Sequence, residues 1–270
     1  MKTVLVSGSF DNLVCRHVRL LHEASRLGRV HVALWSDDAV EATTGRPPKF
    51  PLAERRYMVG ALRFVDSLDV TGEARLAETP PATPGGKPDL WAMMEEDLTI
   101  GRRAAAKERG ITLRTFSEEE LADHPILPPQ RPSGRKKVMV TGCYDWFHSG
   151  HVRFFEEVSG LGDLHVVVGS DANVKLLKGE GHPLFSEGER RYLVGSVRFV
   201  TQSLVSTGTG WMDAAPEVER IRPDFYVVNE DGDKPEKREF CRMRGIEYVV
   251  LKRTPREGLV GRFSTKLRGF

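Results

Sequence analysis

An internal repeat is the feature that most constrains how this chain can fold. Residues 54–65, ERRYMVGALRFV, match residues 189–200, ERRYLVGSVRFV, at a spacing of 135 (189 − 54 = 135). Two further pairs match in the same way: 8–11 with 142–145, and 88–90 with 223–225. The spacing is 134 for the first of these pairs (142 − 8 = 134), so the second copy has one additional loop residue between this stretch and the next. The chain therefore contains two copies of one structural unit.

Strands and helices are expected to alternate within each copy. In the first copy we expect strands at 3–7, 30–35, 67–70 and 90–94, helices at 18–27, 52–63 and 100–110, and a closing segment at 111–116. This alternation favours a parallel sheet with helices on both faces. The sequence thus predicts an α/β protein with two tandem Rossmann-like domains, each a doubly wound parallel sheet that binds ligands at the carboxyl ends of its strands.

A proline-rich stretch separates the two copies. Residues 123–137 contain four prolines and end in a basic cluster, a composition typical of a linker. We therefore expect a first domain at 1–122, the linker at 123–137 and a second domain at 138–270.

Composition excludes several classes of protein. Charged residues make up 29% and hydrophobic residues 40% of the 270, and no apolar run approaches the length needed to cross a bilayer. A net charge of +2 is too small to favour nucleic acid as a partner. Cys15, Cys143 and Cys241 are scattered and odd in number, which argues against a disulfide framework or a zinc site. Because the N-terminus enters a strand-like segment without a cleavable apolar region, we expect a cytoplasmic protein with no membrane span.

The most informative stretch of the second copy is residues 138–155. An apolar, β-branched run ends at Gly142, a short loop follows, and a helical pattern begins near Ser149. His148 and His151 therefore fall at the start of a helix, where free N–H groups and the helix dipole favour an anion. Gly150 between them lets a ligand approach the backbone without meeting a Cβ atom. This arrangement predicts a phosphate site.

The sequence Gly142-Cys143-Tyr144-Asp145 followed by His148-Ser-Gly-His151 resembles the signature of the cytidylyltransferase-like nucleotidyltransferases. In that family the His-x-Gly-His motif holds the phosphates of a nucleoside triphosphate. The tandem layout is similar to that of the ethanolamine-phosphate cytidylyltransferases. The resemblance implies that Gly142, Cys143, Tyr144, Asp145 and Gly150 belong to a nucleotide site.

The reaction implied by this resemblance is a direct displacement. The phosphate of a small acceptor attacks the α-phosphorus of CTP, and pyrophosphate leaves as CMP is transferred. A phospho-alcohol, a phospho-amino-alcohol such as ethanolamine phosphate, and a sugar phosphate all fit as acceptors. Mg²⁺ is the expected cofactor, on the β and γ oxygens. Two alternatives remain: an adenylyltransferase that uses ATP on a sugar phosphate, and a regulator that binds a nucleotide without turnover.

The resemblance also assigns roles to individual side chains. His148 and His151 bind the triphosphate, and a lysine of the loop after the second strand contacts the charge that develops in the transition state. Lys178 is the first choice for that lysine and Lys175 the second. For either one alone, a solvated surface lysine is the alternative.

Further nucleotide contacts are expected from the last third of the chain. Arg253, Arg262, Ser264 and Thr265 resemble the second signature of the family, an arginine-led segment that ends in hydroxyl residues at a helix start. Either Arg253 or Arg262 can be the phosphate-binding arginine.

Three more positions complete the predicted site. Asn229 and Asp231 follow a strand at the same sheet edge, where they can contact the base, the ribose or a metal, although a polar turn also explains them. Trp211 lies where related enzymes place residues near the acceptor, and a core or loop aromatic is the alternative. No direct role is expected for His165 or His182.

The two copies differ at the positions that phosphate chemistry requires. Val14 replaces His148 and Arg16 replaces Gly150, whereas His17 matches His151. Glu41 and Thr44 stand in place of the two lysines. We therefore expect the first copy to be non-catalytic, with a homodimer or an intramolecular pseudo-dimer as the assembly.

Overall fold

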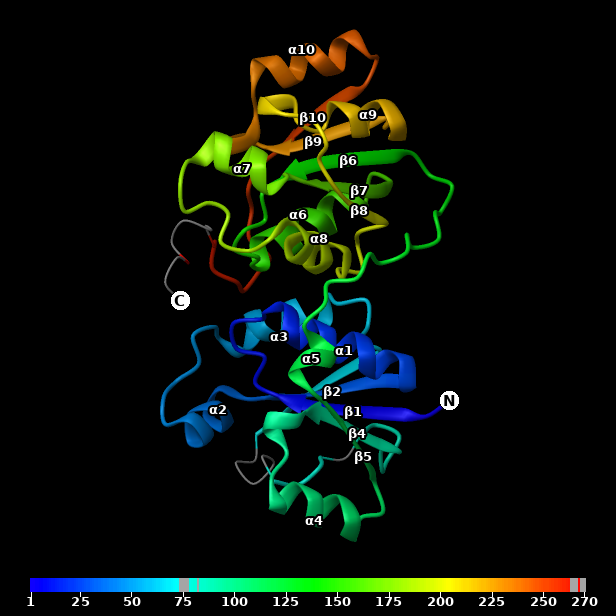
Figure 1. The fold of residues 1–270 in the computed structure, drawn as a ribbon, viewed down its shortest axis with the longest axis vertical. Coiled ribbons are helices and arrows are strands. Elements are labelled where there is room, and N and C mark those ends of the chain that lie inside the picture. Colours follow the sequence, from blue (N-terminus) through cyan, green and yellow to red (C-terminus); the bar gives the residue numbers. More distant parts are fainter. Residues whose placement is uncertain (73–77, 82, 263–266, 268–270) are drawn as a thin grey trace. The chain divides into compact units, whose positions relative to one another are not determined.

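The computed structural model describes residues 1–72, 78–81, 83–262 and 267. The chain divides into two compact units, Met1–His124 and Pro125–Gly269, each built on its own five-stranded sheet (Figure 1). All of the strand pairs within the two sheets are parallel. The predicted α/β class, with two tandem Rossmann-like sheets, is confirmed.

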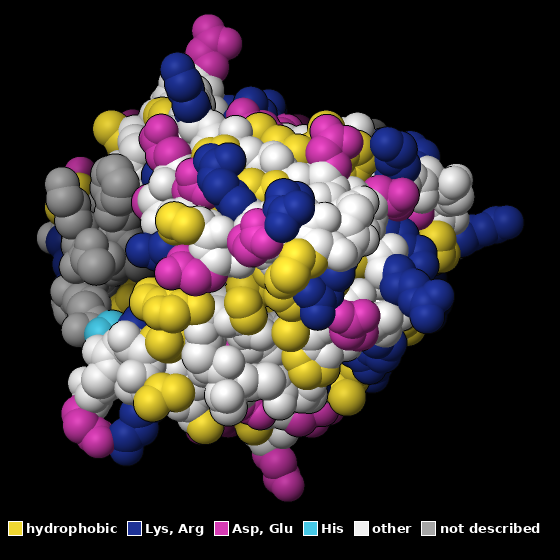
Figure 2. Space-filling view, turned by 90° about the horizontal axis from the view of Figure 1, so that it is seen from above, with side chains coloured by type: hydrophobic (Ala, Val, Ile, Leu, Met, Phe, Trp, Pro, Cys, Tyr) yellow, Lys and Arg dark blue, Asp and Glu magenta, His cyan; other side chains and the backbone are white. Residues whose placement is uncertain are grey.

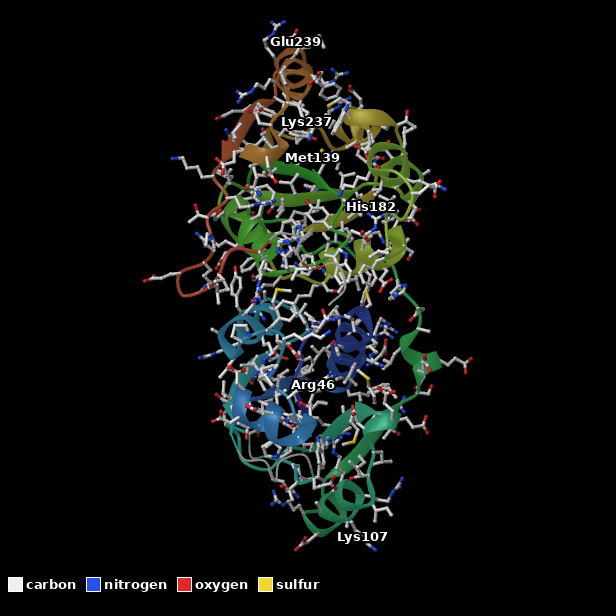
Figure 3. The ribbon with its side chains drawn as sticks, turned by 90° about the vertical axis from the view of Figure 1, so that its left-hand side faces the viewer. Arg46, Lys107, Met139, His182, Lys237 and Glu239 are labelled. Carbon is white, nitrogen blue, oxygen red and sulfur yellow. The ribbon has the colours of Figure 1, made fainter. Side chains whose placement is uncertain are left out.

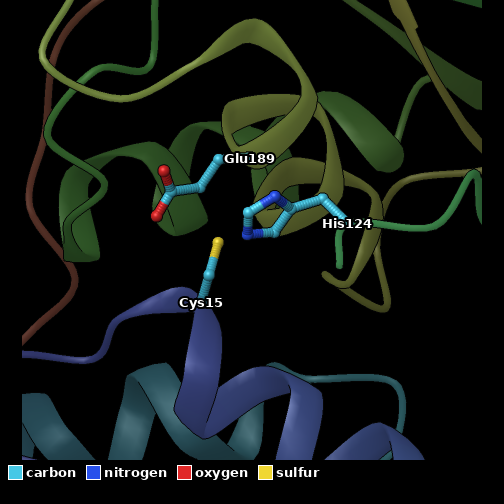
Figure 4. Close-up of side chains that lie close together, drawn as sticks. All are labelled: Cys15, His124 and Glu189. Carbon is cyan, nitrogen blue, oxygen red and sulfur yellow. The ribbon is translucent and has the colours of Figure 1, made fainter. Parts of the chain in front are cut away.

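The first sheet has the order β3-β2-β1-β4-β5. Its strands are β1 (Thr3–Gly8), β2 (Arg29–Trp35), β3 (Ser67–Thr71), β4 (Leu90–Met94) and β5 (Thr112–Phe116). The helices of this unit are α1 (Cys15–Leu27), α2 (Asp37–Thr44), α3 (Leu52–Gly60), α4 (Ile100–Glu108) and α5 (Glu118–Leu121), with a 3₁₀ turn, η2 (Glu95–Asp97). Cys15 is the first residue of α1 (Figure 4).

The second sheet has the order β10-β9-β6-β7-β8, which repeats the order of the first. Its strands are β6 (Lys137–Gly142), β7 (Asp163–Val168), β8 (Gln202–Val205), β9 (Phe225–Asn229) and β10 (Glu247–Leu251). The helices are α6 (Ser149–Ser159), α7 (Asp171–Lys178), α8 (Glu187–Gly195), α9 (Ala215–Ile221) and α10 (Pro235–Met243), with 3₁₀ turns η3 (Gly210–Met212) and η4 (Glu230–Gly232). Glu189 lies in the first turn of α8 (Figure 4).

The strand order places a switch point beside β6. The chain moves from β6 to β7 on one side and later returns to β9 on the other side of β6. In open α/β sheets a ligand crevice forms at such a point, outside the carboxyl ends of the strands. The carboxyl end of β6 is Gly142, where the predicted phosphate motif begins.

Burial on both faces explains why the central strands are almost continuously apolar. Val138, Met139 and Val140 in β6 are fully buried. Met139 lies inside the second unit (Figure 3), where it packs with residues from α9, β9 and α10 that include Val218, Tyr226 and Phe240. This core holds the carboxyl edge of the sheet in place.

The predicted linker is attached to the second unit by hydrogen bonds. The backbone N–H of Gln130 donates to the carbonyl of Thr201 (2.8 Å), and its side-chain amide donates to the carbonyl of Val200 (2.6 Å). The hydroxyl of Ser133 donates to a carboxylate oxygen of Asp163 (2.7 Å). Residues 125–136 therefore run along the surface of the second unit before β6 begins.

The helices and one face of the protein bear on possible contacts with a membrane or a polyanion. None of the helices in the described ranges is long and apolar enough to cross a membrane. Figure 2 shows basic and acidic side chains interspersed over one face of the protein.

Candidate active site

The loop after β6 is shaped by a tyrosine in a left-handed backbone conformation. Tyr144 has φ +55°, and a Cβ atom at Gly142 would lie 2.7 Å from Cζ of its ring. The buried ring packs edge-on against His151, with 5.3 Å between ring centroids, and lies tilted against Phe155 at the same distance. Gly142 is therefore required for the tyrosine to fold back and support the second histidine of the motif.

Backbone hydrogen bonds fix both histidine rings at the start of α6. The N–H of Gly150 donates to Nδ1 of His148 (3.1 Å), and the N–H of His148 donates to Nδ1 of His151 (3.3 Å). The two rings stack with 3.9 Å between centroids. Since Nδ1 is the acceptor in each ring, the proton of the neutral imidazole sits on Nε2. Each ring therefore presents an Nε2–H donor.

The surroundings keep these imidazoles neutral. Burial, followed by the guanidinium groups of Arg253 and Arg262, lowers the pKa of His148 to about 4. Burial, followed by the charges of His148, Arg253 and Lys178, lowers the pKa of His151 well below its usual value. At pH 7 both rings are neutral hydrogen-bond donors surrounded by cations, an arrangement suited to phosphate oxygens.

Gly150 is required because the His148 ring covers its backbone. A Cβ atom there would lie 2.9 Å from Cε1 and 3.0 Å from Nδ1 of His148. In the first unit the corresponding residue, Arg16, has a side chain, and the corresponding ring is absent because Val14 replaces the histidine. The two substitutions are thus physically linked.

We expect Gly150→Ala to weaken nucleotide binding by roughly 5- to 150-fold, because the added methyl group displaces the His148 ring at a cost of roughly 1–3 kcal/mol. Titration calorimetry with ATP and CTP measures the affinity. Arg16→Gly, which alters the same position of the first unit, serves as the control and is expected to bind with wild-type affinity. Unchanged affinity in Gly150→Ala would show that the ring position does not matter.

Most of the predicted site residues line one cavity of about 540 Å³ at the carboxyl edge of the second sheet. Ten of them are on its wall: Gly142, Cys143, Tyr144, Asp145, His151, Lys178, Trp211, Asn229, Asp231 and Arg253. Gly150 and Arg262 line a smaller cavity of about 50 Å³, which shares Asn229 and Arg253 with the larger one. Ser264 and Thr265 lie outside the described residues.

The two candidate lysines occupy different positions. Both belong to α7, a helix capped by the Ser170 side chain, so the expectation of a loop here is wrong. Lys178, the last residue of the helix, lines the cavity. Lys175 is mostly exposed and pairs with Glu180 (3.0 Å). The structure therefore brings only the first of these lysines to the cavity.

The carboxylate of Asp145 is engaged with the backbone. Its Oδ1 accepts from the N–H groups of Leu184 (2.8 Å) and Phe185 (3.0 Å). Asp11 makes the matching bonds in the first unit, to the N–H groups of Lys49 and Phe50. This aspartate therefore attaches the motif loop to the segment before α8, as its counterpart does before α3.

The sequence model described as cytidylyltransferase-like matches residues 139–258. An FAD synthase of Aciduliprofundum boonei is 39% identical over 119 residues, which cover 43% of this chain and 76% of the relative. The chain belongs to the cytidylyltransferase-like family.

Other relatives of this cytidylyltransferase-like protein are longer. The bifunctional protein HldE of Campylobacter concisus is 37% identical over 200 residues, which cover 67% of this chain and 41% of that protein. Among solved structures, the lipopolysaccharide core biosynthesis protein of Thermoplasma volcanium is 26% identical, with 44% of this chain and 98% of that chain covered and a TM-score of 0.38.

The predicted family is thus confirmed, and the chain is a nucleotidyltransferase of that family. The narrower likeness to the ethanolamine-phosphate cytidylyltransferases stays a prediction.

A buried arginine that sequence reasoning did not assign organises the cytidylyltransferase-like site. Arg190 is fully buried, and its guanidinium donates to the carbonyls of Cys143 (2.7 Å) and Phe185 (2.9 Å) and to Asp171 (2.6 Å). It thereby joins the motif loop, the segment before α8 and the start of α7. The repeated ERRY sequence carried this signal, since Arg55 makes the equivalent bonds in the first unit.

Two further polar residues position the Trp211 loop. Asn173, which is buried, accepts from the N–H of Gly210 (2.7 Å) and donates to its carbonyl (3.2 Å). Asp213 accepts from the hydroxyl of Ser206 (2.7 Å). Comparison of the two copies could have identified Asn173, because the first copy has Ala39 at the matching position.

Proposed function

We propose that the second unit transfers a nucleoside monophosphate from a nucleoside triphosphate to a small phosphorylated acceptor, with release of pyrophosphate. The observation that carries the proposal is the stacked pair of neutral histidines at the start of α6, of which His151 lines the large cavity together with Lys178 and Arg253, while His148 is buried behind it. These groups match the charge and hydrogen-bonding needs of a triphosphate.

In the proposed reaction, an oxygen of the acceptor phosphate attacks the α-phosphorus. The bond from that phosphorus to the bridging oxygen breaks, and pyrophosphate takes the electron pair. His148 and His151 donate hydrogen bonds to the triphosphate, and Lys178 stabilises the charge that builds on the α-phosphate oxygens. We assign binding of the leaving group to Arg253, which lines the cavity and pairs with Asp231 at 2.9 Å.

Mg²⁺ fits the donors that line the cavity. The ion is usually held by one or two carboxylates together with substrate phosphates, and Asp231 supplies a carboxylate on the cavity wall. When bound, Mg²⁺ would neutralise charge on the β and γ phosphates.

The relatives favour ATP ahead of CTP as the nucleotide. FAD, the product in the names of the FAD synthases, contains an adenylyl group, so a related chain that uses ATP needs the smallest change in base recognition. CTP, the nucleotide in the name of the family, is the second candidate.

We propose that the first unit does not catalyse this transfer. Trp35 stands where the second unit has Gly169, and its indole N–H donates to the Ser7 hydroxyl (3.0 Å) on the cavity wall. The guanidinium of Arg16 pairs with Glu96 (3.1 Å) in the same cavity, which measures about 170 Å³. A cavity this much smaller than the one in the second unit, with an acidic side chain on its wall, disfavours a triphosphate.

Pyrophosphate release tests the proposed transfer. ATP and CTP, each with Mg²⁺, are combined with glycerol 3-phosphate, ethanolamine phosphate, choline phosphate and several sugar phosphates, and reactions without acceptor give the background. We expect release with one nucleotide that depends on the acceptor. Tight nucleotide binding without release from any pair would contradict transfer and favour a nucleotide-binding regulator.

A further inference from the structure

One wall of the large cavity carries none of the proposed triphosphate contacts. Asn173, Trp211, Asp213 and Lys237, which we call the acceptor wall, come from α7, η3, the segment after it and α10. Sequence analysis assigned only Trp211 among them. The proposed triphosphate contacts lie on α6, the end of α7 and the β10 side of the cavity, so a second ligand in this cavity would meet the acceptor wall.

Hydrogen bonds hold the wall in a fixed shape. Asn173 binds both the N–H and the carbonyl of Gly210, directly before Trp211. The N–H of Gly208 donates to the carbonyl of Asp213 (2.8 Å), and the Asp213 carboxylate accepts from Ser206 (2.7 Å). The tryptophan is half exposed on a loop closed at both ends, which suits a residue that contacts a ligand rather than the core.

Lys237 is positioned to present a positive charge to the cavity. Figure 3 shows its side chain on the side of α10 that faces the sheet, whereas Glu239 points away. The residue is half-buried, and burial lowers its pKa, while the carboxylate of Asp213 acts in the opposite direction. An ammonium group has three N–H donors, and Lys237 donates to the carbonyl of Gly232 at the long distance of 3.4 Å.

The first unit provides an internal comparison. Arg102 occupies the position of Lys237 and donates to the carbonyl of Asp97, the counterpart of Gly232, at 2.5 Å. That cation is held tightly by the backbone of its own turn, next to a carboxylate that Gly232 lacks. The hydrogen bond to the turn carbonyl therefore explains the position of Arg102 more fully than it explains the position of Lys237, whose bond is longer.

A second ammonium group faces the tryptophan. Nζ of Lys234 lies 5.2 Å from the centroid of the Trp211 ring, within the range of a cation–π contact. An acceptor with its own ammonium group would compete with Lys234 for the electron-rich ring and would meet the like charge of Lys237. The wall thus disfavours a cationic acceptor and suits one that carries phosphate and hydroxyl groups.

We propose that the acceptor wall binds the phosphate of a hydroxyl-bearing acceptor through Lys237, stacks the carbon skeleton of that acceptor on Trp211, and rejects amino-alcohol phosphates. This inference rests on the proposed transfer, because it names the acceptor class of the same site. Asp213 supplies an acceptor for the hydroxyl groups.

Glycerol 3-phosphate and ethanolamine phosphate are matched probes, because they share the phosphate and differ in carrying hydroxyl groups or an ammonium group. We would titrate each into the full chain by calorimetry and measure pyrophosphate release in parallel. Wild type is expected to bind glycerol 3-phosphate at least tenfold more tightly. Lys237→Gln should weaken that binding about 10- to 100-fold, the usual effect of losing a charge-assisted hydrogen bond, whereas Lys237→Arg should retain most of it.

The matched control is Arg102→Gln, which removes the equivalent cation of the first unit and is expected to leave binding of both probes unchanged. Lysine-dependent binding of glycerol 3-phosphate without pyrophosphate release would support the wall and count against the transfer. Release by the wild type with an unchanged acceptor KM in Lys237→Gln would support the transfer and overturn the wall. Tighter binding of ethanolamine phosphate, or no binding of either probe, would also overturn it.

Discussion

Replacing His151 with alanine is expected to lower kcat for pyrophosphate release on the order of 10²-fold or more. The substitution removes an Nε2–H donor that, in the proposed reaction, meets charge as it develops, and the loss of one such donor typically has this effect. The KM for the nucleotide should change much less than kcat, because the interaction strengthens in the transition state.

His17 provides a closely matched control for this substitution. Its Nδ1 also accepts a backbone N–H, from Val14 at 3.3 Å, its ring packs edge-on against Phe10, and burial together with Arg16 lowers its pKa to about 4. His17→Ala should therefore destabilise its own unit about as much as His151→Ala destabilises the second, yet leave turnover near the wild-type level. Equal losses of turnover would refute the assignment of catalysis to the second unit.

Arg190→Met is expected to destabilise the second unit by about 2–4 kcal/mol, because loss of the buried guanidinium leaves two backbone carbonyls without a donor, whereas the partly exposed Asp171 carboxylate can be hydrated. The change leaves the carbonyls of Cys143 and Phe185 without their donor and Asp171 without its guanidinium partner. Because the same arginine fixes the motif loop and the start of α7, turnover should fall with stability.

Arg55→Met makes the equivalent change in the first unit, where the guanidinium binds Ser9, Phe50 and Asp37. Hydrogen exchange measured by mass spectrometry separates peptides of the two units. We expect Arg190→Met to lose protection around α7 and α8, and Arg55→Met to lose it around α2 and α3. Loss of protection confined to the first unit in both variants would show that Arg190 does not organise the site.

The sequence predicts the parallel sheets and most of their strands, but not the interior of the site. The repeat and the apolar runs predict the strands, because strands buried on both faces are almost uniformly apolar. The start of α6 near Ser149 is likewise confirmed. In contrast, Lys175 and Lys178 were expected in a loop, whereas both lie in α7, whose start is capped by the Ser170 side chain.

Charged residues account for most of what the sequence could not reveal. A side chain such as Arg190 is normally expected at the surface, and only its carbonyl and carboxylate partners explain its complete burial. Lys237 stands in a helix rich in charge, and its periodicity alone does not separate it from Lys234 or Glu239. Likewise, the place of Trp35 on the wall of the first unit's cavity depends on how the strand ends and loops meet, which the sequence alone does not show.

The hydrogen bonds to Nδ1 of the two motif histidines have one more consequence. A ring whose Nδ1 is occupied by a backbone N–H and whose Nε2 already bears hydrogen has no lone pair with which to take up a proton. Neither histidine can therefore act as a general base. In the proposed reaction the phosphate of the acceptor must therefore be ionised before it binds. Its second pKa, about 6, would set the lower pH limit of turnover.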